Sequence, residues 1–236
     1  LGHNVSGSDK GTIYPPMNSQ LEKLAIPVSS GYSESSIPDN IDTVIIGNSL
    51  SRGNPLVEKI LDEKIYYLSG PAWLEENVLR DKKKIVIAGT HGKTTISSLV
   101  AWILEKNNLR PGFLIGGIPS NFEFSADIGG GDLFVIEGDE YDSAFFDKRS
   151  KFIHYHPDIL VINNLEYDHA DIFSNLSEIV TQFHHLIRSM ASSATIVRPE
   201  KSRTIDNLLK KGCWSSVKTF GHGADADLQY SYRKSQ

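Results

Sequence analysis

The sequence predicts an α/β fold in which buried strands alternate with helices around a mostly parallel sheet. Short runs of Val, Ile and Leu recur along the chain, and such runs are typical of strands that are buried on both faces of a parallel sheet. Between these runs, apolar residues follow helical spacing. One strand also leads into a glycine-containing turn that opens a helix, over residues 84–95. We therefore expect a small Rossmann-like N-terminal domain, followed by a P-loop-type domain with a mostly parallel sheet.

Residues 1–84 carry the signals of the smaller unit. Leu21, Leu24 and Ala25 predict a short helix that Asn18 or Ser19 can cap. The other expected elements are strand signals over 4–9, strands at 42–47 and 65–68, and helices at 55–61 and 71–79. The charged run 80–84 is interpreted as a solvated connector to the second unit.

Residues 85–236 repeat the alternation more strongly. The expected strands are 85–87, 113–115, 133–136, 159–162 and 195–197, and a helix follows the first of them over 96–104. From Leu176 to Met190 the apolar residues keep helical spacing throughout, and Asn175 with Glu178 predicts a capping box at the start of that helix. The two parts together predict domains at 1–84 and 85–236.

Length and composition are those of a globular protein. The chain has 236 residues, which favours one and a half to two domains, with 39% apolar residues and a net charge of -5. An acidic balance argues against nucleic acid as a partner. The single cysteine, Cys213, cannot form an internal disulfide and fits a reducing compartment. No membrane span or signal peptide is recognisable, so a cytoplasmic location is expected. Because the chain begins at Leu1, within an expected element, we infer a fragment.

The turn after the strand at 85–87 has the features of a phosphate-binding loop. Its residues are Gly89, Thr90, His91, Gly92, Lys93, Thr94 and Thr95. A turn that opens a helix directs unpaired amides and the positive end of the helix dipole at one small volume. Lys93 is expected to reach the β- and γ-phosphates, and the Thr94 hydroxyl to bind Mg²⁺. The loop is shorter than usual, since Ile87 stands where the first glycine is expected. The alternative is a turn that merely caps a surface helix.

Two further strand ends carry polar residues. The strand at 133–136 leads into Glu137-Gly-Asp-Glu-Tyr-Asp142, and such crowded carboxylates favour a divalent cation, with Glu137, the carboxylate nearest the sheet, as the favoured ligand. The strand at 159–162 leads into 163–171, where His169 is a second candidate ligand. A solvated acidic turn and a structural histidine are the alternatives. Residues 116–121 either contact a ligand through backbone amides or form a plain turn.

The loop at 89–94, the acidic string at 137–142 and the string Asn163-Asn-Leu-Glu-Tyr-Asp-His169 together resemble the Mur ligase family of ATP-dependent amide-forming enzymes. The resemblance implies ATP and Mg²⁺ as cofactors, with Lys93, Glu137 and His169 as catalytic residues. It implies Thr94, Glu137 and His169 as metal ligands. It further implies substrate-binding roles for Ser8, Asp9, Asn48, Ser49 and Asn121. Domain 1–84 then binds the UDP-muramyl substrate and domain 85–236 binds ATP, while family members react through an acyl phosphate.

Four more strings resemble the branch of the family that joins UDP-N-acetylmuramate to the murein tripeptide L-alanyl-γ-D-glutamyl-meso-diaminopimelate in cell-wall recycling. They lie at 14–17, 51–55, 144–151 and 168–173. Addition of single L-alanine is the alternative within the family, and a P-loop ATPase or kinase and a non-catalytic nucleotide-sugar binding module are the alternatives outside it.

Three departures from the family are expected. The family's N-terminal domain opens with a strand and a glycine-rich turn that help to bind the UDP moiety, and nothing before Leu1 supplies them, so the N-terminal domain that precedes the central domain is expected to have its first strand missing. The carbamylated lysine of several relatives is absent, because His184 occupies its region, so no carbamate is expected. The family's C-terminal domain would lie beyond Gln236, so the polypeptide as given is expected to bind Mg-ATP weakly and not to turn over.

Overall fold

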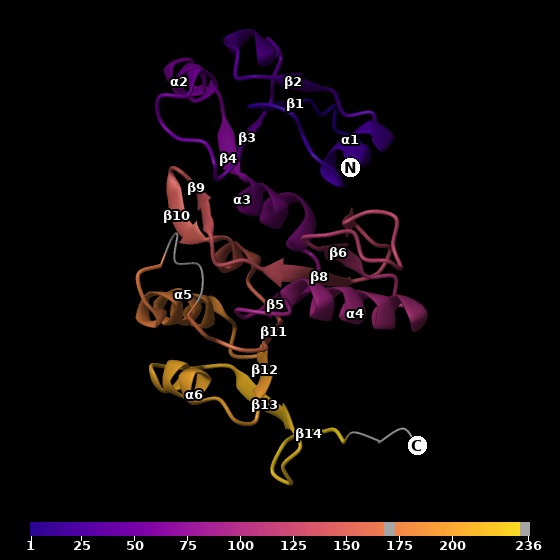
Figure 1. Cartoon of the computed structure of the whole chain (residues 1–236), viewed down its shortest axis with the longest axis vertical. Helices are drawn as coiled ribbons and strands as arrows, with labels where there is room; N and C mark the ends of the chain where they lie inside the picture. Colours follow the sequence, from indigo (N-terminus) through magenta and orange to yellow (C-terminus); the bar gives the residue numbers. More distant parts are fainter. Residues whose placement is uncertain (168–172, 232–236) are drawn as a thin grey trace. The chain divides into compact units, whose positions relative to one another are not determined.

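The computed structural model describes residues 1–167 and 173–231. It is an α/β structure, as the sequence predicts, and it divides into two compact units (Figure 1). The first unit comprises residues 1–73 together with 142–148, and the second comprises 74–141 together with residues from 149 onward. The division therefore falls between Trp73 and Leu74 rather than at the expected boundary of 84, and the first unit also takes in a short segment from the middle of the chain.

The first unit contains two separate pairs of parallel strands. Strand β1 (Gly7–Asp9) pairs with β2 (Val28–Ser30), and β3 (Val44–Ile46) pairs with β4 (Tyr67–Ser69). Its helical segments are α1 (Met17–Lys23), η1 (Glu34–Ser36) and α2 (Pro55–Asp62), and α3 (Gly70–Leu74) follows β4.

The core of the first unit explains why residues 142–148 belong to it. Ile46, Val57 and Ile60 are buried together, and Phe145 packs against this cluster. Phe146 adds an edge-on contact with Tyr67, with ring centroids 4.8 Å apart. Two aromatic side chains from the segment thus join the smaller core.

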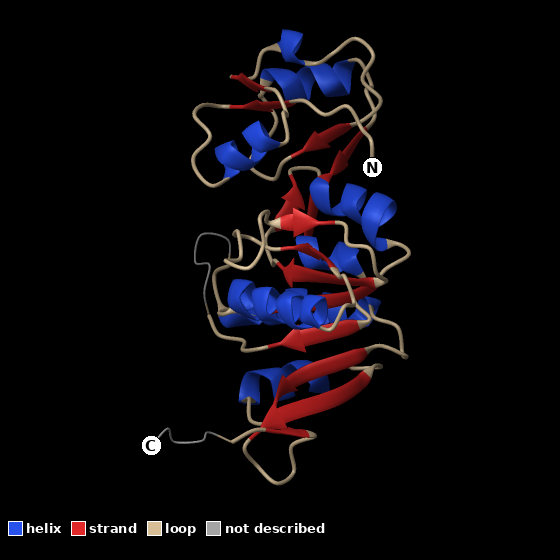
Figure 2. Cartoon of the chain, turned by 90° about the vertical axis from the view of Figure 1, so that its right-hand side faces the viewer, coloured by secondary structure: helices blue, strands red, loops and turns tan. Residues whose placement is uncertain are grey.

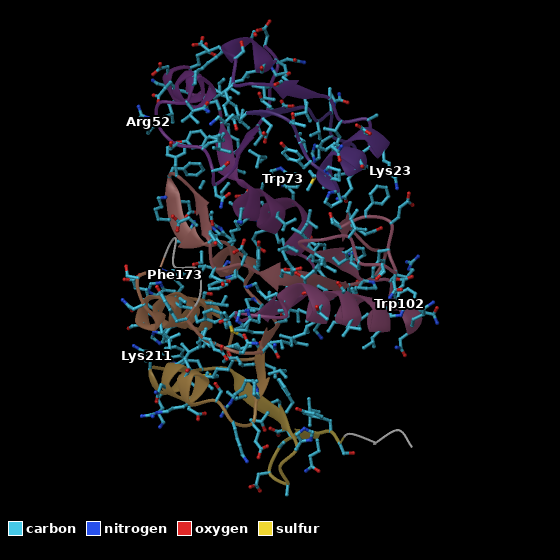
Figure 3. All side chains as sticks on the ribbon, in the orientation of Figure 1. Lys23, Arg52, Trp73, Trp102, Phe173 and Lys211 are labelled. Atoms are coloured by element: carbon cyan, nitrogen blue, oxygen red, sulfur yellow. The ribbon has the colours of Figure 1, made fainter. Side chains whose placement is uncertain are left out.

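Several expectations for the first unit need correction. Residues 4–6 lie outside the strand, which covers only Gly7–Asp9. Asn18 and Ser19 do not cap α1, because the helix already begins at Met17 after Pro16 and both residues lie inside it. Lys23, labelled in Figure 3, ends this helix. In α2, by contrast, Asn54 caps the first turn by accepting from the Leu56 amide at 3.0 Å.

The second unit is built on an eight-stranded sheet with the order β14-β13-β12-β11-β5-β8-β6-β7. All neighbouring pairs are parallel except β6 and β7. The strands are β5 (Lys83–Ala88), β6 (Gly112–Leu114), β7 (Ala126–Asp127), β8 (Leu133–Gly138), β11 (Ile159–Ile162), β12 (Thr195–Pro199), β13 (Ser216–Gly221) and β14 (Leu228–Gln229). Strands β9 (Asp142–Ala144) and β10 (Asp147–Ser150) form a separate two-stranded sheet. The expectation of a mostly parallel sheet is confirmed.

Helices cover both faces of this sheet (Figure 2). Val86 and Ala88 of β5 face the cluster formed with α5 (Leu176–Ser189) and α6 (Arg203–Lys210). Ile85 and Ile87 face the cluster formed with α4 (Lys93–Lys106). Such burial on both faces explains why β5 is apolar without alternation. The remaining helical segments of the unit are η2 (Glu75–Leu79) and η3 (Lys151–Tyr155).

The start of β5 corrects the interpretation of residues 80–84 as a solvated connector. Lys83 and Lys84 belong to β5, and Lys84 is buried. The Lys84 amide donates to Asp158 Oδ2 at 2.8 Å, and the Lys82 ammonium donates to the Gly131 carbonyl. Side-chain charge alone did not indicate how far the strand extends.

The capping box of α5 is confirmed with one difference. Asn175 Oδ1 accepts from the Glu178 amide at 3.2 Å, whereas Glu178 Oε2 accepts from the Ser174 amide at 2.8 Å instead of from that of Asn175. The first interaction satisfies an amide that the first helical turn leaves unpaired, and the second holds the residue before the N-cap against the helix.

The turn between β13 and β14 is held by a carboxylate. The Thr219 amide donates to Asp227 at 2.8 Å, and the Lys218 ammonium lies 2.9 Å from the same side chain. These donors, the Thr219 amide first, lower the pKa of Asp227 to about 2. Among the described residues, no helix combines the length and the hydropathy needed to cross a lipid bilayer.

Candidate active site

The candidate site lies where β5 meets α4, at the carboxyl edge of the sheet. Parallel pairing sets Ala88 beside Ile162 of β11 and Ile87 beside Glu137 of β8. The polar residues that end the three strands therefore arrive together, as expected for an open α/β sheet. Glu137 is itself the penultimate residue of β8, which extends further than the expected strand at 133–136.

Two glycines shape the turn. Gly89 has φ +130°, and a Cβ at this position would lie 2.7 Å from the Asn164 carbonyl oxygen. Gly92 has φ +84° and stands immediately before α4. Residues with a side chain rarely adopt either conformation, so both positions favour glycine. The conformation of the short loop therefore depends on glycine at positions 89 and 92.

The residues that follow β11 hold the loop in place. The Thr90 amide donates to the Asn164 carbonyl at 3.2 Å. The Asn164 side chain accepts from the His91 amide at 2.8 Å and donates to the His91 carbonyl at 3.1 Å. Asn163 Nδ2 donates to the same carbonyl at 3.1 Å, and Thr90 Oγ1 bonds both backbone groups of Glu166. The clamp formed by Asn163, Asn164 and Glu166 fixes the backbone of Thr90 and His91.

The next amides of the loop have no such partners. Among the described residues, none accepts a hydrogen bond from the amides of Gly92, Lys93, Thr94 or Thr95. The side chains of Thr94 and Thr95 are exposed, and α4 extends for 14 residues behind them. Unpaired amides at the positive end of a helix dipole favour anions, and phosphate binding by this loop stays a prediction.

Lys93 folds back over this loop. Its ammonium donates to the Gly89 carbonyl at 2.8 Å and lies 3.4 Å from the Thr90 carbonyl. It also lies 3.4 Å from both carboxylate oxygens of Glu140, whose side chain is only 3% exposed. The one cationic side chain of the loop thus lies directly above the loop backbone.

Glu137 connects two segments at the strand ends. Its Oε2 accepts from the Thr94 hydroxyl at 3.2 Å, and its Oε1 accepts from the Gly116 amide at 2.8 Å. A carboxylate and a hydroxyl in contact are oxygen donors of the kind that Mg²⁺ takes, so the two residues fit a magnesium site. Within the described residues no group of three or more His, Cys, Asp or Glu is arranged to hold a metal ion. His169 lies outside the described residues.

The predicted substrate-binding residues are divided between the two units. Ser8 and Asp9 lie in β1, where the Ser8 hydroxyl donates to the Gly31 carbonyl at 2.5 Å. Asn48 and Ser49 form an exposed turn just after β3. Asn121 belongs to the second unit, in an exposed turn beyond β6. Ser8 is thus the middle residue of β1 and Asp9 its last, while Asn48 and Ser49 follow β3. The role of all five residues stays a prediction.

The sequence indicated no specific role for several residues that contact the loop or Glu137. Glu140 was one of four carboxylates in a crowded string, and nothing in that string indicated which would be buried. Asn163 and Asn164 were part of a family string without an assigned role, although a pair of amide side chains directly after a buried strand is a usable signal. The Gly116 amide was considered only as part of a general backbone contact.

Comparisons with known proteins assign the chain to a family. The model of the Mur ligase middle domain matches residues 87–236, which covers the loop, the acidic strand end and the clamp. The chain belongs to the Mur ligase family. The family resemblance predicted from the sequence is thereby confirmed.

Within the family, the chain is 52% identical over 221 residues to the UDP-N-acetylmuramate–L-alanyl-gamma-D-glutamyl-meso-2,6-diaminoheptandioate ligase of Escherichia coli K12, covering 94% of this chain and 48% of that protein. The ligase of the same name from Haemophilus influenzae is 46% identical over 94% of this chain and 49% of its own length. This chain therefore spans about half the length of the curated relatives it matches.

Solved structures give the same family and fold. The UDP-N-acetylmuramate:L-alanyl-gamma-D-glutamyl-meso-diaminopimelate ligase of Neisseria meningitides superposes with a TM-score of 0.86 at 49% identity, covering 92% of this chain and 70% of that one. A UDP-N-acetylmuramate-alanine ligase from Thermotoga maritima gives a TM-score of 0.71 at 25% identity, covering 92% of this chain and 46% of that one.

Proposed function

We propose that the protein is an ATP-dependent ligase that joins UDP-N-acetylmuramate to the tripeptide L-alanyl-γ-D-glutamyl-meso-diaminopimelate. The observation that carries the phosphoryl-transfer part is the contact of Thr94 with Glu137 next to Lys93, at the unpaired amides of α4. The acceptor is supported by the names of the relatives at 52% and 46% identity, which state this substrate pair.

The loop residues have separate tasks in this proposal. Amides from Gly92 to Thr95 bind the phosphates of ATP, and Lys93 places its positive charge on the β- and γ-phosphates. Thr94 and Glu137 hold Mg²⁺, with His169 as a further proposed ligand. When bound, Mg²⁺ screens the charge that develops on the transferring phosphoryl group. Because phosphoryl transfer needs little covalent participation by the protein, positioning and charge stabilisation are its main contributions.

The proposed reaction has two balanced steps. A carboxylate oxygen of the muramyl group attacks the γ-phosphorus, the bond to the β-γ bridging oxygen breaks, and ADP leaves. The α-amine of the tripeptide then attacks the acyl carbon, inorganic phosphate leaves with the former carboxylate oxygen, and the amine gives up one proton. Lys93 stabilises the negative charge of the first step.

The smaller unit is the proposed site for the UDP-muramyl substrate, with Ser8, Asp9, Asn48 and Ser49 as binding residues. Asn121 of the second unit is a separate proposed substrate-binding residue. Open α/β folds bind ligands near the carboxyl ends of their strands, and this supports the proposal, because Asp9 ends β1 with Ser8 before it while Asn48 and Ser49 follow β3. A cytoplasmic location and a role in cell-wall recycling are part of the proposal, since UDP-sugars and ATP meet there.

The test is an acceptor competition on the full-length protein. With Mg-ATP and UDP-N-acetylmuramate present, tripeptide and L-alanine are offered together, and the two amide products are quantified by mass spectrometry. We expect the tripeptide product to dominate. A Lys93→Ala variant should lose ligation and keep UDP-N-acetylmuramate binding, whereas loss of both would show that the loop does not have the proposed role.

A second candidate is the ligase that adds single L-alanine. Relatives with that name match this chain at 30–34% identity, for example at 31% over 97% of the chain. A dominant L-alanine product would favour it. Phosphate release that ignores UDP-N-acetylmuramate would instead favour a P-loop ATPase or kinase.

A further inference from the structure

Glu140 is a buried carboxylate next to the lysine of the phosphate loop. Its side chain is 3% exposed, and that of Lys93 is 16% exposed. Both carboxylate oxygens lie 3.4 Å from the Lys93 ammonium. A buried charge is costly unless it is paired, so a glutamate at this depth needs a cation nearby.

The segment that carries Glu140 is held firmly on either side. Asp139 accepts from the Tyr141 amide at 3.0 Å and pairs with the Lys151 ammonium at 2.7 Å. The Lys151 amide donates to the Tyr141 carbonyl at 2.9 Å, and the Phe152 amide donates to the Asp139 carbonyl at 3.2 Å. Glu140 is therefore presented from a fixed backbone rather than from a free turn.

The same strand end thus contacts two consecutive residues of α4. Glu137 accepts from Thr94, and Glu140, three residues later, pairs with Lys93. Glu137 is exposed enough to bind a cation, whereas Glu140 is buried behind the loop. The two carboxylates are consequently suited to different tasks.

The donors of Lys93 show what Glu140 controls. An ammonium has three N–H donors, and here they are directed at the carbonyls of Gly89 and Thr90 and at Glu140. The carbonyl contacts keep the side chain folded over the loop, and the carboxylate supplies the charge that holds it there. A flexible four-carbon stem without such a partner would lose this position, because lysine is a compact charge on a rotatable chain.

We propose that Glu140 is a positioning residue that holds the Lys93 ammonium over the phosphate loop, ready to contact the transferring phosphoryl group. This inference rests on the proposed function. Glu140 touches neither ATP nor the muramyl substrate, and its effect passes through Lys93. Its negative charge also opposes the binding of phosphate, so position is gained at some cost in nucleotide affinity.

Two substitutions separate charge from shape. Glu140→Gln keeps the size of the side chain and removes its charge, whereas Glu140→Asp keeps the charge and shortens the side chain. If Glu140 positions Lys93 by charge, Glu140→Asp retains more turnover than Glu140→Gln. If Glu140 only fills space, the order is reversed. Glu105→Gln, an exposed position on α4, is the matched control and should behave as the unaltered protein.

The experiment measures kcat for ADP formation and Kd for Mg-ATP on the full-length protein, with thermal unfolding to confirm that each variant is folded. For Glu140→Gln we expect kcat to fall about tenfold, with a Kd for Mg-ATP that is tighter than that of the unaltered protein because an opposing negative charge has been removed. Unchanged kcat in Glu140→Gln, or Glu140→Asp as the weaker variant, would overturn the proposal.

Failure of the proposed function gives a different result. If the unaltered protein binds Mg-ATP but forms no ADP in response to UDP-N-acetylmuramate, the ligase proposal fails, and Glu140 is then judged on binding alone. Tighter binding of Mg-ATP by Glu140→Gln than by Glu105→Gln would still support the inference, and equal binding would overturn it.

Discussion

Replacing Asn164 by alanine tests whether the residues after β11 organise the phosphate loop. The substitution removes one hydrogen bond to the His91 amide, at 2.8 Å, and one to the His91 carbonyl, at 3.1 Å. Asn163 still donates to that carbonyl, so the amide is the group that loses its protein partner. A net hydrogen bond is worth about 0.5–1.5 kcal/mol, and water can reach the exposed His91. We expect the ordered conformation of the loop to be destabilised by about 1–1.5 kcal/mol, which corresponds to binding of Mg-ADP with a Kd about five- to tenfold weaker.

The assay is isothermal titration with Mg-ADP, together with hydrogen exchange at the His91 amide. Exchange at this amide should become faster in the variant, because its hydrogen-bond acceptor has been removed. Asn107→Ala is the matched control, since it deletes the same kind of side chain at the far end of α4, where Nδ2 donates to the Ile103 carbonyl at 2.7 Å. A Kd within twofold of the unaltered protein, with unchanged exchange at His91, would refute the idea that Asn164 orders the loop.

Further predictions concern backbone strain, core packing and pH. Gly89→Ala should lower the free energy of unfolding, measured by urea titration, by about 2–4 kcal/mol, because the residue has φ +130° and its new Cβ would lie 2.7 Å from a carbonyl oxygen. Gly47→Ala is the control: a Cβ there would meet nothing within 4 Å, so the free energy of unfolding should change by less than about 0.5 kcal/mol. Leu186→Ala, at 0% exposure, should cost about 2–5 kcal/mol by the same measurement, and Leu99→Ala, at 53% exposure, less than about 1 kcal/mol. Because the pKa of Asp227 in the folded protein is lowered to about 2, its contribution to stability should be complete above about pH 4 and be lost as the pH falls toward 2. In acid unfolding, Asp227→Asn should lack this loss of stability between about pH 4 and pH 2.

The regular parts of the second unit could be predicted because local and tertiary requirements agree there. β5 reads as an unbroken apolar run because both of its faces are covered, and α5 keeps helical spacing because one face packs on the sheet while the other is exposed. The first turn of α5 could also be located, because the side chain of Asn175 does what the capping pattern requires.

Other features depended on contacts between residues far apart in the sequence. The hairpin β9–β10 belongs partly to the first unit, because Phe145 packs against the core of that unit. No local sequence pattern indicates this contact. Lys84 reads as a solvated charge in a basic run, yet it lies in a strand whose backbone pairs on both sides. Asn18 is a good capping residue by type, but the helix begins earlier. For the hairpin and for Lys84, tertiary packing overrides the local preference.

The candidate site shows the same division. The loop motif, Glu137 and the shared strand edge could be read from residue order, because parallel strands bring their carboxyl ends together. The pairing of Lys93 with Glu140 and the clamp from Asn164 could not, because each depends on a side-chain direction across a sequence separation of more than 40 residues. The motif therefore predicts the anion site, and only the fold shows which residues hold the loop in its conformation.

The most direct test of the proposed chemistry follows an oxygen atom. UDP-N-acetylmuramate labelled with ¹⁸O in the muramyl carboxylate is incubated with the full-length protein, Mg-ATP and the tripeptide, and the released inorganic phosphate is analysed by mass spectrometry. An acyl phosphate formed at this loop requires that one ¹⁸O atom passes from the carboxylate to phosphate for each amide bond made. Phosphate released without ¹⁸O while ADP accumulates would contradict it and would show that the site only hydrolyses ATP.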